Sequence, residues 1–429
     1  MGPAYLLLVL ALVPTAGSGE TRLFRGATLH PAEGPVIEDA DLLVEDGRIA
    51  AVGPRDTFSI PAGTLVEDVT GKVIIPGLVD THSHVGLYPL PAVAANQDGN
   101  ETSSPVTPEV RALDSIWPAD PRIRMALAGG ITTANVMPGS GNAVGGQTAY
   151  LKLRGDRVED MLVRNHDGVA VLGGMKMANG ENPKRARPKK APMTRMGVAF
   201  LQRKLFVEAE LHRAKSDAEG PDLRLDPMVE VLEGRRVVQH HTHRADDILT
   251  VLRLADEFGH RVVIQHGTEA HLVAAELAER GIPVSTIVVE SPGGKLEAIE
   301  LDYSHPALLE AAGVRVAIHT DDMITPSRLF LRSAALAVRG GMSEAGALRA
   351  VTLEAARMLD LGDQLGSLEP GKDADLVILS GPPFSVWTRV LETWIEGERV
   401  WDADDPNDLR FQTGGYQLGD SYPAMGATP

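Results

Sequence analysis

Two patterns of apolar and polar positions follow one another along the chain. Residues 21–76 contain short segments in which apolar and polar residues alternate, as in residues 41–52, and glycine and proline interrupt them. Alternation with a period of two is typical of half-buried strands, and the pair Asp46-Gly47 favours a tight turn between two of them. The N-terminal part of the chain is therefore predicted to form antiparallel strands.

From Val73 onward, apolar runs alternate with longer helical patterns. The runs predicted as strands lie near residue 74 and at residues 131–137, 169–172, 237–239, 262–265, 284–288 and 314–318. Helical patterns such as that of residues 245–258 lie between several of these runs. Such alternation predicts a parallel sheet, and seven or eight strands fit an α/β fold of the TIM type, a (β/α)8 barrel.

Short strand patterns return after a last helix predicted around residues 344–360. They lie at residues 375–379, 390–395 and 399–401, and we expect them to complete a small β-sandwich domain with the N-terminal strands. The predicted division is a signal peptide at 1–18, the β-sandwich domain at 19–75 and 361–405, the barrel at 76–360 and a tail at 406–429.

Composition narrows the class of protein. Hydrophobic residues make up 43% of the 429 residues and charged residues 23%, which is typical of a soluble globular enzyme. The formal net charge of -17 disfavours partners rich in phosphate, such as nucleic acids. The chain has no cysteine, which excludes disulfides, thiolate catalysis and cysteine-bound zinc.

The first residues predict export. An apolar run at residues 5–13 precedes Pro14 and the small residues 16–18, as in a secretory signal with its cleavage region. The run is too short to cross the ~30 Å hydrocarbon core of a membrane, so no membrane anchor is expected. Residues 1–4 lack the usual lysine or arginine, which leaves a misplaced start or a buried N-terminal strand as alternatives. We expect a periplasmic or secreted protein.

Residues that commonly bind metals follow several predicted strands. They are His82 and His84 after the strand near residue 74, His241 and His243 after 237–239, His266 after 262–265, and Asp321 and Asp322 after 314–318. A single His-Ser-His sequence is a weak signal. However, the carboxyl ends of barrel strands form the face on which active sites are built, so the set predicts a metal site.

Seven segments together resemble the amidohydrolase superfamily, and most closely its imidazolonepropionase-like and prolidase-like members. The segments are PGLVDTHSH (76–84), GGITTANVMPGS (129–140), GGMKMANGENPKR (173–185), HTHRADD (241–247), IQHGTE (264–269), AIHTDD (317–322) and GSLEPGKDADLVIL (366–379). The resemblance covers nearly the whole chain after the predicted signal peptide. It implies a divalent metal centre of one or two ions, most readily zinc, although imidazole and carboxylate ligands also suit manganese, iron or cobalt.

The resemblance also implies which residues bind these ions. His82 and His84 would bind the more buried ion, His241 and His266 the second, and Asp321 the first ion together with the attacking water. Lys176 corresponds to a lysine that some relatives carboxylate to N6-carboxylysine, whose carbamate bridges two ions. The alternatives are an ammonium that binds substrate or a residue that only lines the barrel, and a single-ion site then becomes the expectation.

Some assignments near the expected site remain open. His243 is the alternative to His241 as a ligand and is otherwise expected to contact substrate, whereas His240 should face the outer helices. Asp322 replaces Asp321 if the register differs by one residue. His319 is expected to be structural.

The expected reaction is hydrolysis of a carbon-nitrogen bond in a small molecule. A metal lowers the pKa of bound water toward ~7, Asp321 would accept its proton and later protonate the leaving nitrogen, and the second metal or His243 would polarise the carbonyl. The expected substrate is a dipeptide, an N-acyl amino acid or a cyclic amide. A lactonase or esterase is the enzymatic alternative, and a non-catalytic binding protein on the same barrel is the second alternative.

Four charged residues on two loops are candidates for substrate binding. Glu181, Lys184 and Arg185 belong to the fourth loop of the catalytic face of the expected barrel, and Lys295 belongs to the seventh. The alternative is that they are solvated loop residues, which is common for charged positions on loops. A homo-oligomer is compatible with this fold.

Overall fold

The computed structural model describes residues 20–186, 189–215, 220–288 and 294–413. The predicted signal peptide at 1–18 and residues 414–429 of the predicted tail lie outside the described residues. Within the described ranges, no helix is both long enough and apolar enough to cross a membrane.

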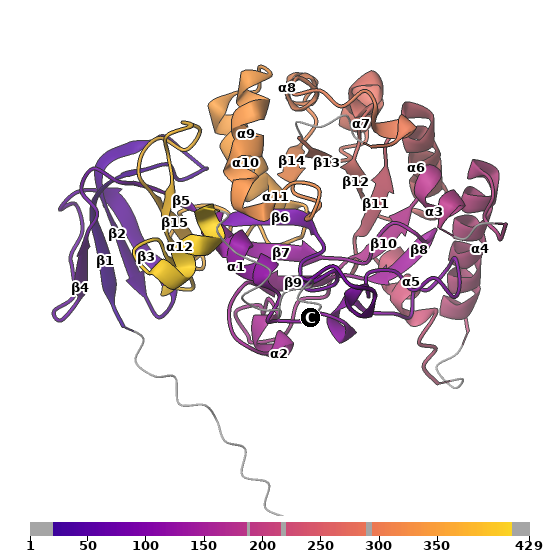
Figure 1. Cartoon of the computed structure of the whole chain (residues 1–429), viewed down its shortest axis with the longest axis horizontal. Helices are drawn as coiled ribbons and strands as arrows, with labels where there is room; N and C mark the ends of the chain where they lie inside the picture. The colour runs from indigo at the N-terminus through magenta and orange to yellow at the C-terminus, as the bar shows by residue number, and fades with distance from the viewer. Residues whose placement is uncertain (1–19, 187–188, 216–219, 289–293, 414–429) are drawn as a thin grey trace, which may run out of the picture.

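One sheet joins the two ends of the chain (Figure 1). Its strands are β1 (Arg22–Leu29), β2 (Ile37–Glu45), β3 (Arg48–Pro54), β4 (Leu65–Asp68), β5 (Val73–Pro76), β15 (Leu376–Leu379), β16 (Val390–Ile395) and β17 (Glu398–Asp402). They pair in the order β17-β16-β15-β5-β1-β2-β3, and β4 pairs with β1. Asp46 and Gly47 connect β2 and β3 with φ values of 49° and 77°, which confirms the predicted tight turn.

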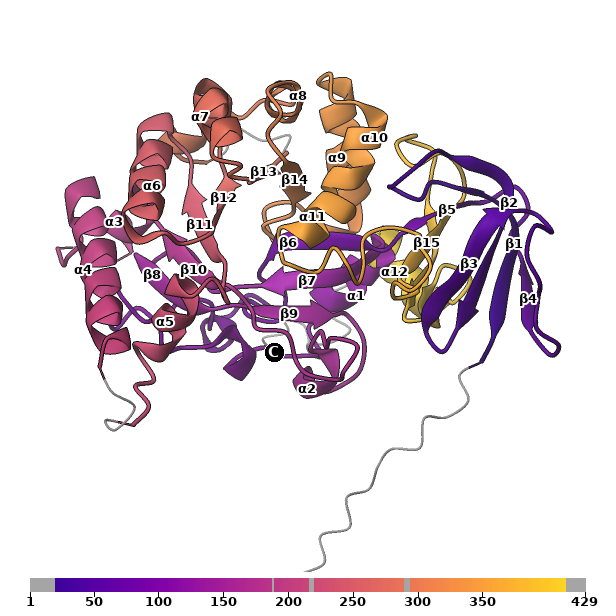
Figure 2. The same ribbon diagram turned by 180° about the vertical axis from the view of Figure 1, so that it is seen from behind.

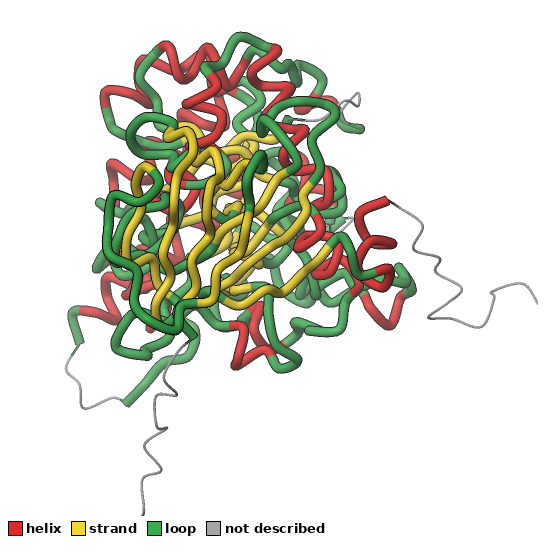
Figure 3. Tube along the Cα trace, turned by 90° about the vertical axis from the view of Figure 1, so that its left-hand side faces the viewer, coloured by secondary structure: helices red, strands yellow, loops and turns green. Residues whose placement is uncertain are grey.

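The predicted β-sandwich takes the form of one hydrogen-bonded sheet that packs against itself. Its strands lie side by side on the face of the molecule shown in Figure 3. Phe24 in β1 and Trp394 in β16 come from strands that are not neighbours in the sheet, yet their ring centroids are 5.0 Å apart, and one buried apolar cluster contains both. The first half of β1 pairs with β4 and its end pairs with β5, so that β1 connects both parts of the sheet.

The rest of the chain combines strands with surrounding helices (Figure 2). The strands are β6 (Leu78–Ser83), β7 (Ile131–Val136), β8 (Val144–Gln147), β9 (Ala149–Lys152), β10 (Met175–Ala178), β11 (Val238–Thr242), β12 (Val262–His266), β13 (Val284–Ile287) and β14 (Val316–His319). Strands β10 to β14 are parallel, with β8 antiparallel at the edge of their sheet, and β6-β7-β9 form a second sheet. This mixed α/β architecture confirms five of the seven strands predicted for this part of the chain. The strand predicted near residue 74 is β5 of the eight-stranded sheet, and β6 takes its place beside β7.

The two sheets meet at both edges. The backbone N–H of Asp321, just after β14, donates to the carbonyl oxygen of His82 in β6 at 2.9 Å. At the other edge, only Thr148 separates β8 from β9. The residues that follow β6, β11, β12 and β14 therefore lie at the same end of the molecule.

One predicted strand was wrong. Residues 169–172 form no strand, and the side chains of Val169 and Leu172 are 60% and 42% exposed. The buried segment β9 takes the place beside β7, and it runs antiparallel. The apolar run at 169–172 was short, and short apolar runs do not distinguish a strand from an apolar loop.

The helices surround the strands. They are α1 (Pro121–Ala128), α2 (Val158–Met161), α3 (Glu181–Arg185), α4 (Arg195–Arg213), α5 (Asp226–Leu232), α6 (Ala245–Phe258), α7 (Ala274–Glu279), α8 (His305–Ala311), α9 (Phe330–Arg339), α10 (Glu344–Ala350), α11 (Leu353–Arg357) and α12 (Pro406–Thr413). The predicted helix at residues 245–258 is confirmed as α6, which ends at Gly259 in the left-handed conformation. The segment predicted as a tail begins with α12. The side chain of Phe411 in this helix is buried against the core.

A buried histidine, His260, should make the stability of the fold sensitive to acid. His260 stacks on Phe206 of α4 with ring centroids 4.6 Å apart, and burial lowers its pKa from 6.5 to about 4. Its contribution to stability is therefore fully present above pH 6.5 and is lost as the pH falls through about 4. That shift corresponds to about 3 kcal/mol of unfolding free energy.

We expect the variant His260→Gln to lose less stability on acidification than the parent, by about this amount. The measurement is urea unfolding of both proteins at pH 7 and pH 4. An equal loss in the two proteins would contradict the role of His260.

Candidate metal centre and substrate cavity

Histidine and aspartate side chains from four strand ends converge on one buried region. His82 lies in β6, His241 in β11 and His266 at the end of β12, while His84, His243 and Asp321 follow β6, β11 and β14. Three sets have ligand atoms within 4.8 Å of one another: His82, His84 and Asp321; His241, His243 and His266; and His82, His266 and His319. The structure therefore brings together the six residues that the sequence placed at the site, His82, His84, His241, His243, His266 and Asp321, and adds His319 to them.

The first set is oriented around the Asp321 carboxylate. Its Oδ1 lies 3.1 Å from Nε2 of His84 and 3.6 Å from Nε2 of His82. Nδ1 of His84 donates to the carbonyl oxygen of Met137 at 2.7 Å, and Nδ1 of His82 faces Oε1 of Gln265 at 3.2 Å. Hydrogen bonds at Nδ1 leave both Nε2 atoms able to act as ligands.

The second set contains buried nitrogen atoms without a partner. Nδ1 of His243 lies 2.7 Å from Oγ1 of Thr268. Among the described residues, Nε2 of His243 and Nε2 of His266 have no hydrogen-bond partner. Burial holds the pKa of His241, His243 and His266 well below the usual value, so the rings are neutral at pH 7. Neutral, buried and unpartnered imidazole nitrogens fit a divalent cation.

The sequence left open whether His241 or His243 is a ligand. The structure does not favour His241 alone, because both histidines belong to the second set. His240 is directed elsewhere, since its Nε2 lies 3.1 Å from Nε2 of Gln202 in α4. His319 was expected to be structural, yet it joins the third set. Its Nε2 lies 3.2 Å from Nδ1 of His266, and its Nδ1 lies 2.8 Å from Oγ of Ser285.

Lys176 lies beside the first set of side chains, which contains His82, His84 and Asp321. Its Nζ is 3.0 Å from Nε2 of His82 and 3.0 Å from Sδ of Met137. Burial lowers the pKa of Lys176 to about 7, although the charge of Asp321 opposes this shift. An appreciable fraction of this amine is therefore uncharged near neutral pH.

Asp321, not Asp322, is directed at the histidines. Burial opposes ionisation of Asp321, but the hydrogen bond and charge of His84 outweigh it and lower its pKa. Asp322 instead accepts a hydrogen bond from the backbone of Ser327 at 3.2 Å and faces Arg122 at 3.7 Å. The predicted register is therefore correct.

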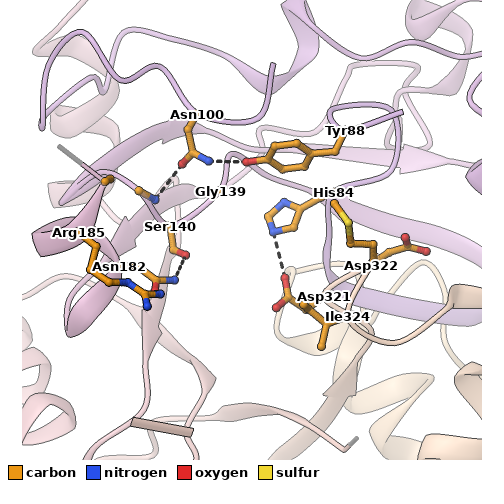
Figure 4. A pocket seen from close by; sticks show the side chains of 13 residues that line it. His84, Tyr88, Asn100, Gly139, Ser140, Asn182, Arg185, Asp321, Asp322 and Ile324 are labelled. Carbon is orange, nitrogen blue, oxygen red and sulfur yellow. Dashed lines mark hydrogen bonds and ion pairs between the residues drawn. The ribbon is translucent and has the colours of Figure 1, made fainter. Parts of the chain in front are cut away.

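Two adjoining cavities open onto these histidines and Asp321. One has a volume of about 370 Å³ and is lined by His84, Tyr88, Asn100, Ser140, Arg185 and Asp321, among others (Figure 4). The other, of about 340 Å³, reaches His241, His243 and His266. Both are lined by Ser140, Asn182, Arg185 and Asp321, so one substrate could extend through both.

The four loop residues predicted to bind substrate divide into two pairs. Arg185 lines both cavities, and Lys295 lies 3.3 Å from Nε2 of His241 and 3.4 Å from Oδ1 of Asn182. Glu181 and Lys184 line a neighbouring hollow instead. Glu181 exchanges hydrogen bonds with the backbone and carboxylate of Glu297 at 3.1 and 2.8 Å, which connects the two loops.

Two cavity residues were not anticipated from the sequence. Tyr88 and Asn100 come from the irregular segment after β6. Burial, together with the charge of Asp321, raises the pKa of Tyr88 to about 12. A search for tyrosine or asparagine shortly after the His-Ser-His sequence would have found both residues. The sequence alone gives no reason to select them over other polar residues of that segment.

Comparison with known proteins identifies the family. Residues 229–400 match the Amidohydrolase family. A crystal structure of an amidohydrolase from Thermotoga maritima MSB8 is 39% identical, covers 89% of this chain and 100% of its own, and superimposes with a TM-score of 0.84. The chain belongs to the amidohydrolase family. This family assignment makes it a hydrolase of carbon-nitrogen bonds.

Two other relatives show the range of the family. The amidohydrolase tasK of Hapsidospora irregularis is 29% identical over 90% of this chain, which spans only 44% of that longer protein. The imidazolonepropionase of Sphingopyxis alaskensis is 24% identical, over 91% of this amidohydrolase and 93% of its own length. Family members typically depend on divalent metals, which agrees with the unpartnered histidine nitrogens described above.

Proposed function

We propose that this amidohydrolase is a metal-dependent enzyme that hydrolyses the carbon-nitrogen bond of a dipeptide, an N-acyl amino acid or a cyclic amide. The observation that carries the proposal is the pair of buried, unpartnered Nε2 atoms of His243 and His266, which line the same cavity as the Asp321 carboxylate. A buried nitrogen without a partner costs free energy, and a bound cation would offset that cost.

Six side chains would hold one or two ions. His82, His84 and Asp321 form one set, and His241, His243 and His266 form the other. Imidazole and carboxylate donors without thiolate favour zinc. When bound, such an ion acts as a Lewis acid and lowers the pKa of water to ~7.

Asp321 is the residue best situated to accept the proton of the attacking water. Its carboxylate is ionised near neutral pH, lines both cavities and is fixed by His84. After attack on the carbonyl, the same group would return the proton to the leaving nitrogen.

The positions of Lys295 and Arg185 favour a substrate that carries a carboxylate group. Their cationic groups are 3.4 and 3.0 Å from Oδ1 of Asn182, which aligns both of them at the cavity wall. In a chain with a net charge of -17, two convergent cations are a local feature that would attract an anion. The three proposed substrate classes include members with a free carboxylate, which could bind here.

Three further proposals concern architecture and location. We propose that the β6-β7-β9 sheet and the β14-β13-β12-β11-β10-β8 sheet form one closed TIM-type barrel, supported by the contacts at both edges. The eight-stranded sheet would be a separate domain. Export to the periplasm or medium is proposed from residues 5–18 of the sequence alone.

Lys176 is proposed to carry a carbamate that bridges two ions. Its position 3.0 Å from Nε2 of His82 supports this, because a bridging group must lie beside the ligands of the first ion. The carbamate would replace a buried cation with an anion, and so favour two adjacent metal ions.

Metal analysis should test both the centre and Lys176. We expect about two equivalents in protein purified with bicarbonate, a marked loss in Lys176→Ala, and little change in the control Lys184→Ala, because Lys184 lines the neighbouring hollow. About one equivalent that the Lys176 substitution leaves unchanged would contradict the carbamate. Absence of bound metal in the parent, together with no turnover of dipeptides, N-acyl amino acids and cyclic amides, would contradict the proposed function.

A further inference from the structure

The loop that carries Tyr88 is fixed on both sides of this residue. The buried carboxylate of Asp120 accepts hydrogen bonds from the backbone N–H groups of Gly86 at 2.8 Å and Leu90 at 3.2 Å. The guanidinium of Arg122 donates to the carbonyl oxygen of Tyr88 itself. The position of the Tyr88 side chain is therefore established before substrate binds.

The direction of one hydrogen bond at the Tyr88 hydroxyl follows from its neighbours. The backbone N–H of Gly141 donates to Oδ1 of Asn100 at 2.8 Å, so the amide group of Asn100 turns its Nδ2 toward Tyr88 (Figure 4). Nδ2 of Asn100 then donates to the Tyr88 hydroxyl oxygen. Among the described residues, no acceptor is found for the hydroxyl proton of Tyr88. That proton remains available to a ligand in the cavity.

The surroundings leave the hydroxyl little freedom to move away. A side chain at Gly99 or Gly139 would collide with the ring or hydroxyl of Tyr88, so the hydroxyl is packed closely between two glycines. The Tyr88 ring also packs edge-on against His84, with ring centroids 5.6 Å apart. Tyr88, His84 and Asp321 line the same cavity.

We propose that Tyr88 is a catalytic residue whose hydroxyl donates a hydrogen bond to the oxygen of the scissile carbonyl. As the water oxygen bonds to the carbonyl carbon, its proton passes to Asp321 and the π electrons of the carbonyl move to that oxygen. The Tyr88 proton stays on Tyr88 and stabilises the negative charge. When the carbon-nitrogen bond breaks, the proton on Asp321 moves to the nitrogen and the carbonyl re-forms.

The contribution of Tyr88 should appear in the transition state. A hydrogen bond to a neutral carbonyl is weaker than one to an oxyanion, so a fixed donor lowers the barrier more than it strengthens substrate binding. This inference rests on the proposed function, because it requires a carbonyl that becomes tetrahedral.

The first test is Tyr88→Phe, which removes the hydroxyl and keeps the ring beside His84. We expect kcat to fall about 10²–10³-fold with a small change in KM and unchanged metal content. A phosphonamidate analogue of the best substrate, measured by calorimetry, should lose affinity by a factor comparable with the fall in kcat/KM. The amino acid product, which has no tetrahedral centre, should bind to both proteins equally.

The second test reverses one hydrogen bond. In Asn100→Asp, one carboxylate oxygen can still accept from Gly141, but the other would accept the Tyr88 proton and divert it from the cavity. We expect a fall in kcat similar to that of Tyr88→Phe. The double variant should be no slower than Tyr88→Phe, because the added charge then has no hydroxyl to capture.

The possible results separate the two proposals. Equal kcat and equal phosphonamidate affinity in the parent and Tyr88→Phe would overturn the role of Tyr88 alone. A loss of metal or a rise in KM that explains the whole effect would also overturn it, since a structural role predicts those changes. Failure of the parent to turn over any carbon-nitrogen substrate would overturn the proposed function and this inference together.

Discussion

Replacing Asp321 with asparagine is expected to lower kcat by about 10²–10⁴-fold while most of the metal stays bound. Asparagine keeps one oxygen near His84, where the aspartate Oδ1 now lies at 3.1 Å, but the amide cannot accept the proton of water. The backbone should tolerate the change, because φ of Asp321 is 47° and asparagine adopts the left-handed region readily. The measurements are kcat on the best substrate and metal content of the purified variant.

Asp322→Asn provides the matched control. Its carboxylate contacts Ser327 and Arg122 and is not directed at the histidines, so we expect this variant to retain most of the activity. Near-full turnover by Asp321→Asn would show that another group accepts the proton. A larger loss in Asp322→Asn than in Asp321→Asn would mean that the roles of the two residues are exchanged.

The histidines and Asp321 could be located from the sequence because local patterns determine their positions. Each follows an apolar run that becomes a buried strand, and the carboxyl ends of parallel strands meet at one face. The resemblance to a family then added Lys176, which no periodicity distinguishes from other lysines. The histidines and Asp321 gather in the structure as the pattern predicted, and the preference for Asp321 over Asp322 came from the resemblance.

The rest of the site depends on contacts between distant residues. Tyr88 and Asn100 lie in an irregular segment whose path is determined by the buried Asp120 and Arg122, and no local pattern reveals such contacts. His319 was expected to be structural. Its contact with His266 could not be predicted, because the two residues are 53 positions apart in the sequence. The prediction of a strand at 169–172 was wrong for the same reason, since only the tertiary structure determines that β9 lies beside β7.

A buried ion-pair cluster joins β9 to the segment before β15. Nζ of Lys152 is buried and lies 2.9 Å from Oδ2 of Asp373 and 2.7 Å from Oδ2 of Asp375. Burial disfavours the charged form of Lys152, but Asp375 and Asp373 outweigh it and raise its pKa above 10.5. The stabilisation from this lysine is therefore fully present below pH 10.5 and is lost only as the pH rises through its raised pKa.

We expect Lys152→Met to lower the free energy of unfolding by about 3–5 kcal/mol, because two carboxylates remain buried without their cation. Urea unfolding at pH 7 measures the loss. The control Lys204→Met removes an exposed ion pair with Glu208, in which the lysine side chain is 58% exposed, and should cost less than about 1 kcal/mol.

Adding Asp373→Asn and Asp375→Asn to Lys152→Met should recover part of the loss, since the penalty arises from the unpaired charges and not from the missing methylenes. Recovery would explain physically why the GKDADL sequence accompanies a buried lysine in β9. A loss in Lys152→Met no larger than that in Lys204→Met would mean that water or neighbouring groups such as Glu396, 3.8 Å from Nζ, already compensate these carboxylates.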